Sequence, residues 1–332
     1  MHAFFGRWRA SDWNVSGCRL FLLGSCLMNE SKNKLTIGVV ANVSAGKTTL
    51  INALLGDDIL LSRNAACTQT VYKISLKKTR HVKGKFPGQK YQNITQYLLE
   101  NWNVSDFPQI DIKAEPYNTA LKNKNIIIYD TPGNNDNINK KAASLAHFGL
   151  SRKRLDMLIC ILDYRCPGSN DERKMLNAVK KIYTSRRKKI KIIFFLNQID
   201  NFRSHDRTLV KQIQNVKKRL HKAGFDDYQL LYGMAQETLL LRMYIQNKLN
   251  DPYEQIELKR QVEIHDKLIP QIKKLYKMDS FKLPTIACSG GDSHIPSAQS
   301  EQNDISFLHY LELLTGISTL ENIILKEVEN VN

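Results

Sequence analysis

The sequence predicts an α/β fold in which a doubly wound, mostly parallel sheet is followed by a C-terminal helical appendage. Short apolar runs rich in β-branched residues alternate with helical patterns, as in parallel strands joined by crossover helices. The 332 residues suit one large domain, or one domain with an appendage, because single cores rarely grow beyond about 250–300 residues. The content of 42% hydrophobic and 24% charged residues excludes a wholly disordered chain.

Six short apolar runs are expected to form buried strands. They are Leu35–Val40, Val71–Leu76, Ile126–Tyr129, Met157–Leu162, Ile190–Leu196 and Gln229–Met234. Helices are expected between and after these runs, because apolar residues there recur at helical spacing. The expected helices are Thr48–Leu55, Asp171–Tyr183, the stretch from Leu209 to Leu220, Thr238–Lys248, Pro252–Met278 and two short helices within Phe307–Val328.

This order of elements predicts three parts. Residues 1–33 are expected to form a loose N-terminal extension, and residues 34–250 the α/β domain. Residues 251–332 are expected to form a helical appendage that completes or flanks that domain. No internal repeat divides the chain further.

The N-terminal residues and the cysteines predict a cytoplasmic protein without a transmembrane segment. The apolar stretch Leu20–Met28 is much shorter than a bilayer span of about 20 residues, and it is too short for an export signal. Met28 is an alternative to Met1 as the start of the chain. The six cysteines show no paired spacing, so neither a zinc site nor a disulfide framework is indicated.

The segment Ala41–Thr49 lies between the first expected strand and the first expected helix. It has the pattern of a phosphate-binding loop, with Ala41 where a glycine is usual. Backbone N–H groups of such a loop turn inward to hold phosphate oxygens, and Gly46 permits their close approach. Lys47 would neutralise the outer phosphates, and the Thr48 hydroxyl would bind magnesium. The candidate nucleotide-binding residues of this loop are Asn42, Val43, Ser44, Ala45, Gly46, Lys47, Thr48 and Thr49.

The sequence Asp-Thr-Pro-Gly at residues 130–133 directly follows the expected strand Ile126–Tyr129. It is therefore expected at a carboxyl end of the sheet, the edge where doubly wound sheets bind ligands. Asp130 would hold magnesium through a water molecule, and the Gly133 N–H would reach a γ-phosphate. The same four residues also suit a plain β-turn.

The segment Asn197-Gln198-Ile199-Asp200 follows the expected strand Ile190–Leu196 and is a candidate guanine-recognition motif. The Asp200 carboxylate can accept hydrogen bonds from the ring N–H and the exocyclic amine of guanine, a pair that adenine does not offer. Gln198 stands where a lysine is usual; it can pack on the base but brings no charge. We therefore expect guanine specificity with weakened affinity. Asn197 and Asp200 would also suit a simple helix cap after a strand.

Thr68 lies between the phosphate loop and Asp130 in the sequence. This position suits a switch threonine whose hydroxyl meets magnesium and whose N–H meets the γ-phosphate. Thr70 competes with it for this role. The expected magnesium ligands are thus Thr48, Thr68 and Asp130. Together, these motifs predict that the sheet is of P-loop GTPase type.

The run from Ala41 to Gly56 resembles the phosphate loop and first helix of dynamin-family GTPases, particularly the bacterial dynamin-like proteins. The segment Ala66-Cys67-Thr68 resembles the first switch of that family. The segment Thr315–Leu320 resembles a stretch that follows the GTPase core. The similarity extends over residues 34–325 and is loose after Asp200.

The resemblance implies hydrolysis of GTP to GDP with magnesium, with Ser44, Lys47 and Thr68 as catalytic residues. It also implies a nucleotide-dependent homodimer, or a separately encoded dynamin-like partner, and contact with membranes. Val43 stands where eukaryotic dynamins carry a catalytic glutamine, so their way of placing the attacking water is not expected here. Ser44 matches the family and would help to position that water. No long helical stalk or membrane-binding module is recognised in the sequence.

Two segments are candidates for the loop that closes over the guanine base. Residues 232–236, which include Ala235, follow an expected strand and precede an expected helix. Residues 287–290 have the more usual composition of a serine and small residues. The first segment is favoured, because the closing residues must lie at the carboxyl end of a sheet strand.

The basic charge is concentrated in one part of the chain. The formal net charge is +17, and the stretch from Lys180 to Lys222 has fourteen Lys and Arg against two acidic residues. Within it, the basic residues 186–189 precede the strand Ile190–Leu196 and are expected at the edge opposite the nucleotide. They could contact an anionic membrane or, less favourably, a nucleic acid, although a solvated basic edge is the simpler interpretation.

Two alternatives to a dynamin-like GTPase remain at this point. The first is a nucleotide-gated binding module in which Val43 leaves intrinsic hydrolysis negligible and GTP only orders the switches. The second is a GTPase associated with RNA or the ribosome, which the basic charge suggests but no RNA-binding motif supports.

Overall fold

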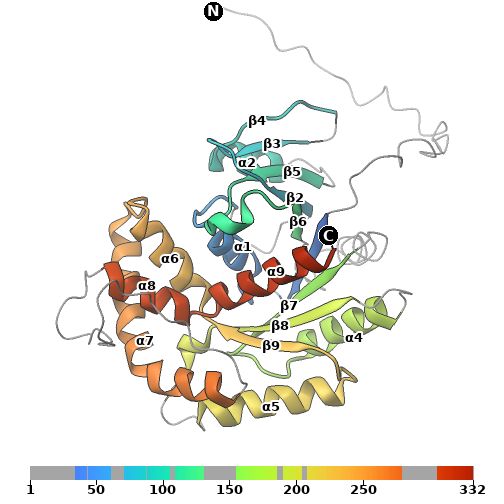
Figure 1. Ribbon diagram of the computed structural model, residues 1–332, viewed down its shortest axis with the longest axis vertical. Helices are drawn as coiled ribbons and strands as arrows, with labels where there is room; N and C mark the ends of the chain where they lie inside the picture. The colour runs from blue at the N-terminus through green and yellow to red at the C-terminus, as the bar shows by residue number, and fades with distance from the viewer. Residues whose placement is uncertain are drawn as a thin grey trace, which may run out of the picture. The chain divides into compact units, whose positions relative to one another are not determined.

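The computed structural model describes residues 34–42, 44–60, 71–86, 88–104, 109–130, 155–184, 190–203, 208–278 and 305–331, which all belong to one unit (Figure 1). The strands are β1 (Leu35–Ala41), β2 (Val71–Leu76), β3 (Lys83–Lys85), β4 (Gln92–Asn93), β5 (Gln109–Ala114), β6 (Ile126–Asp130), β7 (Met157–Asp163), β8 (Lys191–Asn197) and β9 (Gln229–Gly233). The helices are α1 (Lys47–Leu55), α2 (Gln96–Val104), α4 (Asn170–Thr184), α5 (Leu209–Lys222), α6 (Ala235–Ile245), α7 (Pro252–Met278), α8 (Ile305–Leu314) and α9 (Ile317–Val331). Two short 3-10 turns are η1 (Thr119–Leu121) and η2 (Ile199–Asn201).

The strands form a single sheet over the described residues, in the order β4-β3-β5-β2-β6-β1-β7-β8-β9. The strand β1 runs parallel to its neighbours β6 and β7, and β8 and β9 continue in the same direction. The strand β2 is antiparallel to β6 but parallel to β5, and β3 is antiparallel to both β5 and β4. The prediction of a mostly parallel α/β sheet with C-terminal helices is therefore confirmed.

Residues 83–114 contain elements that the sequence analysis does not predict, namely β3, β4, α2 and β5. The strand β5 reads Gln-Ile-Asp-Ile-Lys-Ala, and only alternate residues are buried. It therefore lacks the continuous apolar run by which β6, β7 and β8 are recognised. The predicted strands themselves are present, and β6, β7 and β8 each extend one residue further than expected, to Asp130, Asp163 and Asn197.

Separate apolar clusters cover the two faces of the sheet, because successive residues of a strand point to opposite faces. In β7, Ile159 and Ile161 belong to the cluster that includes α1 and α9. The alternate residues Leu158 and Cys160 belong to the cluster that includes α4, α5 and α7. The central strands are consequently buried on both faces, which explains their continuous apolar sequences.

The C-terminal helix α9 is part of the main core. Its Ile317, Leu320 and Ile324 are buried in the same cluster as β1 and α1. The segment before α9 also contacts the end of β9, where the Met234 N–H donates a hydrogen bond to the Thr315 carbonyl at 3.1 Å. The residues after β9 are thus anchored by the C-terminal part of the chain.

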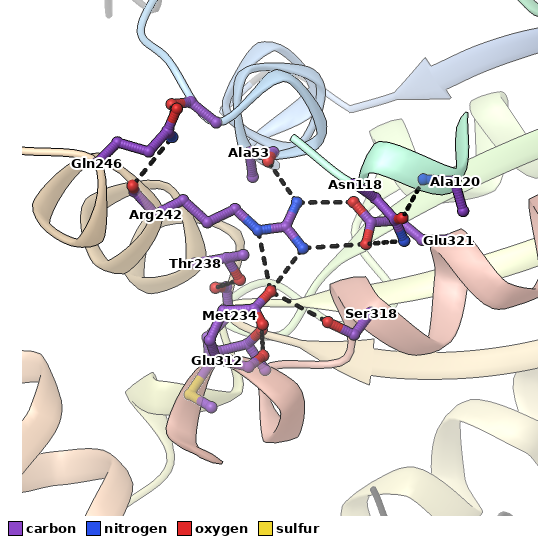
Figure 2. A network of polar contacts seen from close by, with 12 residues as sticks. Ala53, Asn118, Ala120, Met234, Thr238, Arg242, Gln246, Glu312, Ser318 and Glu321 are labelled. Atoms are coloured by element: carbon purple, nitrogen blue, oxygen red, sulfur yellow. Dashed lines mark hydrogen bonds and ion pairs between the residues drawn. The ribbon is translucent and has the colours of Figure 1, made fainter. Parts of the chain in front are cut away.

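A buried ion cluster joins the C-terminal helices to α1 (Figure 2). The Arg242 side chain in α6, only 1% exposed, donates to Glu312 in α8 at 2.5 and 2.9 Å and to Glu321 in α9 at 2.7 Å. It also donates to the Ala53 carbonyl of α1 at 2.7 Å. Burial by itself would lower the pKa of Arg242, but the two carboxylates more than offset this and raise it. Arg242 therefore remains charged and holds three helices to the phosphate-loop helix.

Within the part of the chain that the structure describes, no helix combines the length and the apolar character needed to cross a bilayer.

Candidate nucleotide-binding site

The predicted phosphate loop connects β1 to the N-terminus of α1. Its Ser44 and Gly46 both have left-handed backbone angles, with φ of 60° and 86°. The Gly46 carbonyl accepts the first hydrogen bond of α1, from the Leu50 N–H at 2.9 Å. Left-handed residues that precede a helix N-terminus gather backbone N–H groups into a concave anion site. The loop therefore has the backbone form that phosphate binding requires.

Asn197 explains why residue 46 is a glycine. A Cβ at Gly46 would lie 2.3 Å from the Asn197 Nδ2, a distance that no side chain tolerates. The Asn197 amide instead donates to the Ala45 carbonyl at 2.9 Å, and its Oδ1 accepts from the Ala235 N–H at 3.0 Å. One side chain at the end of β8 thus connects the phosphate loop to the first residue of α6.

This contact also bears on the two candidates for the closing loop. Residues 232–236 run from the end of β9 into α6, beside Asn197 and at the same sheet edge as the phosphate loop. The position of Ala235 agrees with the topological argument for this segment. The competing residues 287–290 lie outside the described residues.

Gln198 and Asp200 follow Asn197 at the end of β8. Gln198 has a left-handed φ of 66°, and its Nε2 donates to the Ser44 carbonyl at 3.2 Å. Its Oε1 is buried without a hydrogen-bond partner among the described residues. Asp200 lies in the 3-10 turn η2, and burial raises the pKa of its carboxyl group. A buried acceptor beside a desolvated carboxylate suits a ligand that brings several N–H donors, as guanine does.

Lys47 and Asp130 form a buried ion pair at the centre of the site. Lys47 is the first residue of α1, and Asp130 is the last residue of β6. The two side chains are 9% and 3% exposed, and the Lys47 Nζ donates to the Asp130 Oδ1. Burial raises the pKa of Asp130, and the attraction of Lys47 opposes this rise.

The remaining predicted residues form two groups: Asn42, Thr48 and Thr49, which the structure describes, and a second group that lies outside the described residues. The Asn42 side chain faces α4; with its amide group turned so that both atoms are satisfied, it donates to the Asp171 carbonyl and accepts from the Glu172 N–H, each at 3.1 Å. In the first turn of α1, Thr48 is half-buried and Thr49 is buried. The predicted residues that lie outside the described ones are Val43, Thr68, Thr70, Gly133 and the basic residues 186–189.

Sequence reasoning missed Asp163 and Arg165. Asp163 is the last residue of β7 and lies beside Asn197 in the sheet register. The Arg165 guanidinium pairs with Asp163 and donates to the Ser44 carbonyl of the phosphate loop at 3.1 Å. The signal for both was available, because they directly follow a buried strand at the carboxyl edge where ligands bind.

Comparisons with known proteins agree with this architecture. Residues 37–199 match the model of the dynamin family. Over 124 residues, the chain is 32% identical to a bacterial dynamin-like protein of Nostoc punctiforme. This aligned region covers 33% of this chain and 18% of the relative. The chain therefore spans less than a fifth of the length of this curated relative.

Two solved structures are similar at lower identity. One is an oligomerised bacterial dynamin pair, described as a mechanism for the long-range sensing and tethering of membranes. It is 18% identical with a TM-score of 0.49, over 75% of this chain and 43% of that one. The other is Toc33 from Arabidopsis thaliana, which is 14% identical with a TM-score of 0.39, over 61% of this chain and 71% of that one.

The family match begins in β1 and ends in η2, so it includes the phosphate loop, Asp130, Asn197 and Gln198. It stops before Asp200 and Ala235, which the fold brings to the same edge. The resemblance expected from the sequence is thereby confirmed. Residues 37–199, just under half of the chain, therefore contain a region that matches the dynamin family.

Proposed function

We propose that this protein binds GTP together with magnesium and hydrolyses it to GDP. The observation that carries the proposal is the position of Asn197. Its side chain connects the phosphate loop at Ala45 to the segment that begins at Ala235. The motif that ends in Asp200 starts at the same residue. One amide group thus connects the proposed phosphate site to the proposed base-closing segment, and the proposed guanine-recognising carboxylate follows it by three residues in the chain.

Guanine selection is assigned to Asp200. Its carboxylate accepts the ring N–H and the exocyclic amine of guanine, a pair of donors that adenine does not offer. Residues 232–236, which include Ala235, are assigned to cover the base, and Gln198 is assigned to pack on it. Burial removes the Asp200 carboxylate from water and so raises its pKa. Ligand donors therefore have less competition from solvent.

The donor chemistry of the site fits magnesium. Thr48 follows Lys47 in α1, and the Asp130 carboxylate pairs with Lys47, so the Thr48 hydroxyl would bind magnesium and Asp130 would hold it through a water molecule. Thr68 is assigned as the third ligand from the sequence. When bound, magnesium would neutralise phosphate charge and orient the terminal phosphate. Lys47 and the backbone N–H groups of the loop would stabilise the charge that develops on the transferred phosphoryl group.

Ser44 is assigned to positioning the attacking water. It is exposed at the rim of the phosphate loop, and its left-handed backbone turns the loop at this point. Val43 does not supply the carboxamide of eukaryotic dynamins, so we expect slow hydrolysis unless a second subunit contributes. This is the reason to propose that the GTP-bound form acts as a homodimer or with a separately encoded dynamin-like partner.

The activity is tested with purified protein and GTP. The parent protein should hydrolyse GTP, and Lys47→Ala should abolish hydrolysis. Asp200→Asn should transfer the preference from guanosine to xanthosine nucleotides, because a carboxamide can donate to the carbonyl that replaces the exocyclic amine. A Lys47→Ala protein that is as active as the parent would sink the assignment of the site.

Single-turnover hydrolysis with excess protein separates the enzyme from a nucleotide-gated binding module. A rate that rises with protein concentration supports a GTPase that is completed by dimerisation. A negligible rate at every concentration, with intact GTP binding, supports the module instead.

The proposed role of the Lys and Arg residues of α5 is contact with an anionic membrane. The helix α5 contains five Lys and Arg residues and no acidic residue, and α4 packs against the same sheet face. Lys211 and Lys218 are exposed on α5. Sedimentation with anionic liposomes should show binding that a non-hydrolysable GTP analogue strengthens. Lys211→Glu with Lys218→Glu should weaken it.

The matched control for this test is Lys77→Glu with Lys78→Glu, which changes the charge equally at exposed positions after β2. If both double variants weaken sedimentation equally, the attraction is nonspecific and the assignment to α5 is wrong.

A further inference from the structure

Two side-chain donors converge on one backbone carbonyl of the phosphate loop. The Gln198 Nε2 donates to the Ser44 carbonyl at 3.2 Å, and the Arg165 Nη2 donates to the same oxygen at 3.1 Å. Gln198 stands where a lysine is usual in this motif, so the charged donor of that position is missing from β8. Arg165, which follows the neighbouring strand β7, brings a charged donor to the same atom.

Arg165 is held in this position by Asp163. The Arg165 Nε donates to one carboxylate oxygen at 3.1 Å, and the Nη2 donates to the other at 2.9 Å. The backbone N–H of Arg165 also donates to this carboxylate, at 2.8 Å. Asp163 is only 6% exposed and is the last residue of a buried strand. A planar guanidinium fixed by two parallel hydrogen bonds has little freedom to leave the Ser44 carbonyl.

The Ser44 carbonyl matters because of the geometry of the peptide bond. In a trans peptide, the C=O and the N–H point in opposite directions. Donors that hold the Ser44 carbonyl therefore also set the direction of the Ala45 N–H. Asn197 acts in the same way on the next peptide, because it holds the Ala45 carbonyl and so sets the Gly46 N–H. The directions of two successive N–H groups are thus set in part from outside the loop, and the Ala45 N–H also donates within the loop, to the Asn42 carbonyl at 3.3 Å.

We infer that Arg165 is a positioning residue for nucleotide binding, which supplies the charged donor to the Ser44 carbonyl that Gln198 cannot supply. The inference rests on the proposed nucleotide site and adds to it a residue that the family motifs do not include. A hydrogen bond from a charged group is stronger than one from a neutral amide. The affinity expected to be weakened by Gln198 is therefore recovered through Arg165.

If Arg165 had only a structural role, its removal would lower the stability of the nucleotide-free protein. The Arg165 side chain is 45% exposed, so water screens its charge, and the backbone N–H of residue 165 still donates to the buried Asp163 carboxylate when the guanidinium is removed. Removal of the guanidinium should therefore leave the melting temperature of the nucleotide-free protein almost unchanged. The effect should appear in the affinity for nucleotide.

The test measures binding of fluorescent GDP with magnesium to the full chain, together with the melting temperature without nucleotide. Arg165→Ala should weaken binding by about tenfold, in line with the loss of one charged hydrogen bond. Arg165→Lys should retain part of the affinity. The matched control is Arg173→Ala, which removes an exposed arginine of α4 that donates to the Gly168 carbonyl before that helix. This control should bind like the parent.

The decisive variant restores the usual lysine. Adding Gln198→Lys to Arg165→Ala should return the affinity to within about threefold of the parent, because the charged donor then comes from β8. If this double variant binds no better than Arg165→Ala, the inference is overturned. It is also overturned if Arg165→Ala binds GDP like the parent. A marked fall in the melting temperature of nucleotide-free Arg165→Ala overturns it as well, because the loss of affinity would then reflect a destabilised fold. In all three results, tight GDP binding by the parent still supports the proposed function. A parent that binds no guanine nucleotide refutes the proposed function itself.

Discussion

Lys47 and Asp130 form an ion pair in which both side chains are almost fully buried. The two residues lie 83 positions apart and come from the start of α1 and the end of β6. Burial penalises each charge, and each is tolerated because the other is present. Two residues proposed to bind phosphate and magnesium therefore also contribute to the stability of the protein.

Removing only one partner should destabilise the nucleotide-free protein. We expect Lys47→Met to lower the free energy of unfolding by about 3 kcal/mol, because Asp130 is left as an unpaired buried carboxylate. Burial raises the pKa of Asp130 above its usual 3.8, and the loss of Lys47 should raise it further. A carboxyl group with a raised pKa in the folded state destabilises the fold as it ionises. The free energy of unfolding of the variant should therefore fall as the pH rises from 3.8 toward the raised pKa of Asp130, and it should level off above that pKa.

Urea unfolding across a pH series measures this effect. The control is the double variant of Lys47→Met with Asp130→Asn, which has no carboxylate at this position. It should recover most of the lost stability and show no comparable pH dependence. Equal instability of the single and double variants would contradict the pairing.

Arg242 is predicted to be critical for attaching the C-terminal helices. Arg242→Met should cost about 3–5 kcal/mol, because it leaves Glu312 and Glu321 buried without their cation. Ser318→Ala removes a single hydrogen bond of 3.0 Å to Glu312 and should cost only about 1 kcal/mol. Denaturant unfolding of the two variants makes the comparison. Similar losses would mean that the ion cluster contributes no more than an ordinary hydrogen bond.

Gly316 is predicted to be required for the contact between the segment before α9 and the end of β9. Its φ is 85°, and a Cβ there would lie 2.2 Å from the Tyr232 carbonyl oxygen. Gly88 has nearly the same φ, 83°, but a Cβ there would meet nothing within 4 Å. Gly88→Ala should therefore cost only the left-handed strain of about 1–2 kcal/mol, whereas Gly316→Ala should cost distinctly more. Thermal unfolding of both variants checks this, and equal losses would refute the steric argument.

Two described cysteines are predicted to differ sharply in reactivity. Cys160 lies in the buried strand β7, and burial raises the pKa of its thiol, so thiolate is scarce. Cys166 is exposed in the loop after β7. Brief treatment of the native protein with iodoacetamide, followed by peptide mass spectrometry, should show alkylation at Cys166 and not at Cys160. Alkylation of Cys160 under native conditions would show that β7 opens readily.

The sequence by itself determined the central part of the fold and most of the candidate site. Strands buried on both faces must be continuously apolar, so β1, β6, β7, β8 and β9 are recognisable locally. The phosphate loop and the guanine motif are also local, because each function needs particular residue types at adjacent positions. The sequence did not reveal β5, because its half-buried pattern alternates and resembles a polar loop.

Tertiary structure alone decided which distant residues meet. No local pattern pairs Lys47 with Asp130, connects Asn197 to Ala235, or brings Arg165 to the carbonyl that Gln198 contacts. These contacts arise because parallel strands place their carboxyl ends at one edge, so residues from separate strands become neighbours. The three contacts join residues 83, 38 and 121 positions apart, respectively. For that reason, the sequence indicated which residue types form the candidate site, and only the fold showed which residues pair with them.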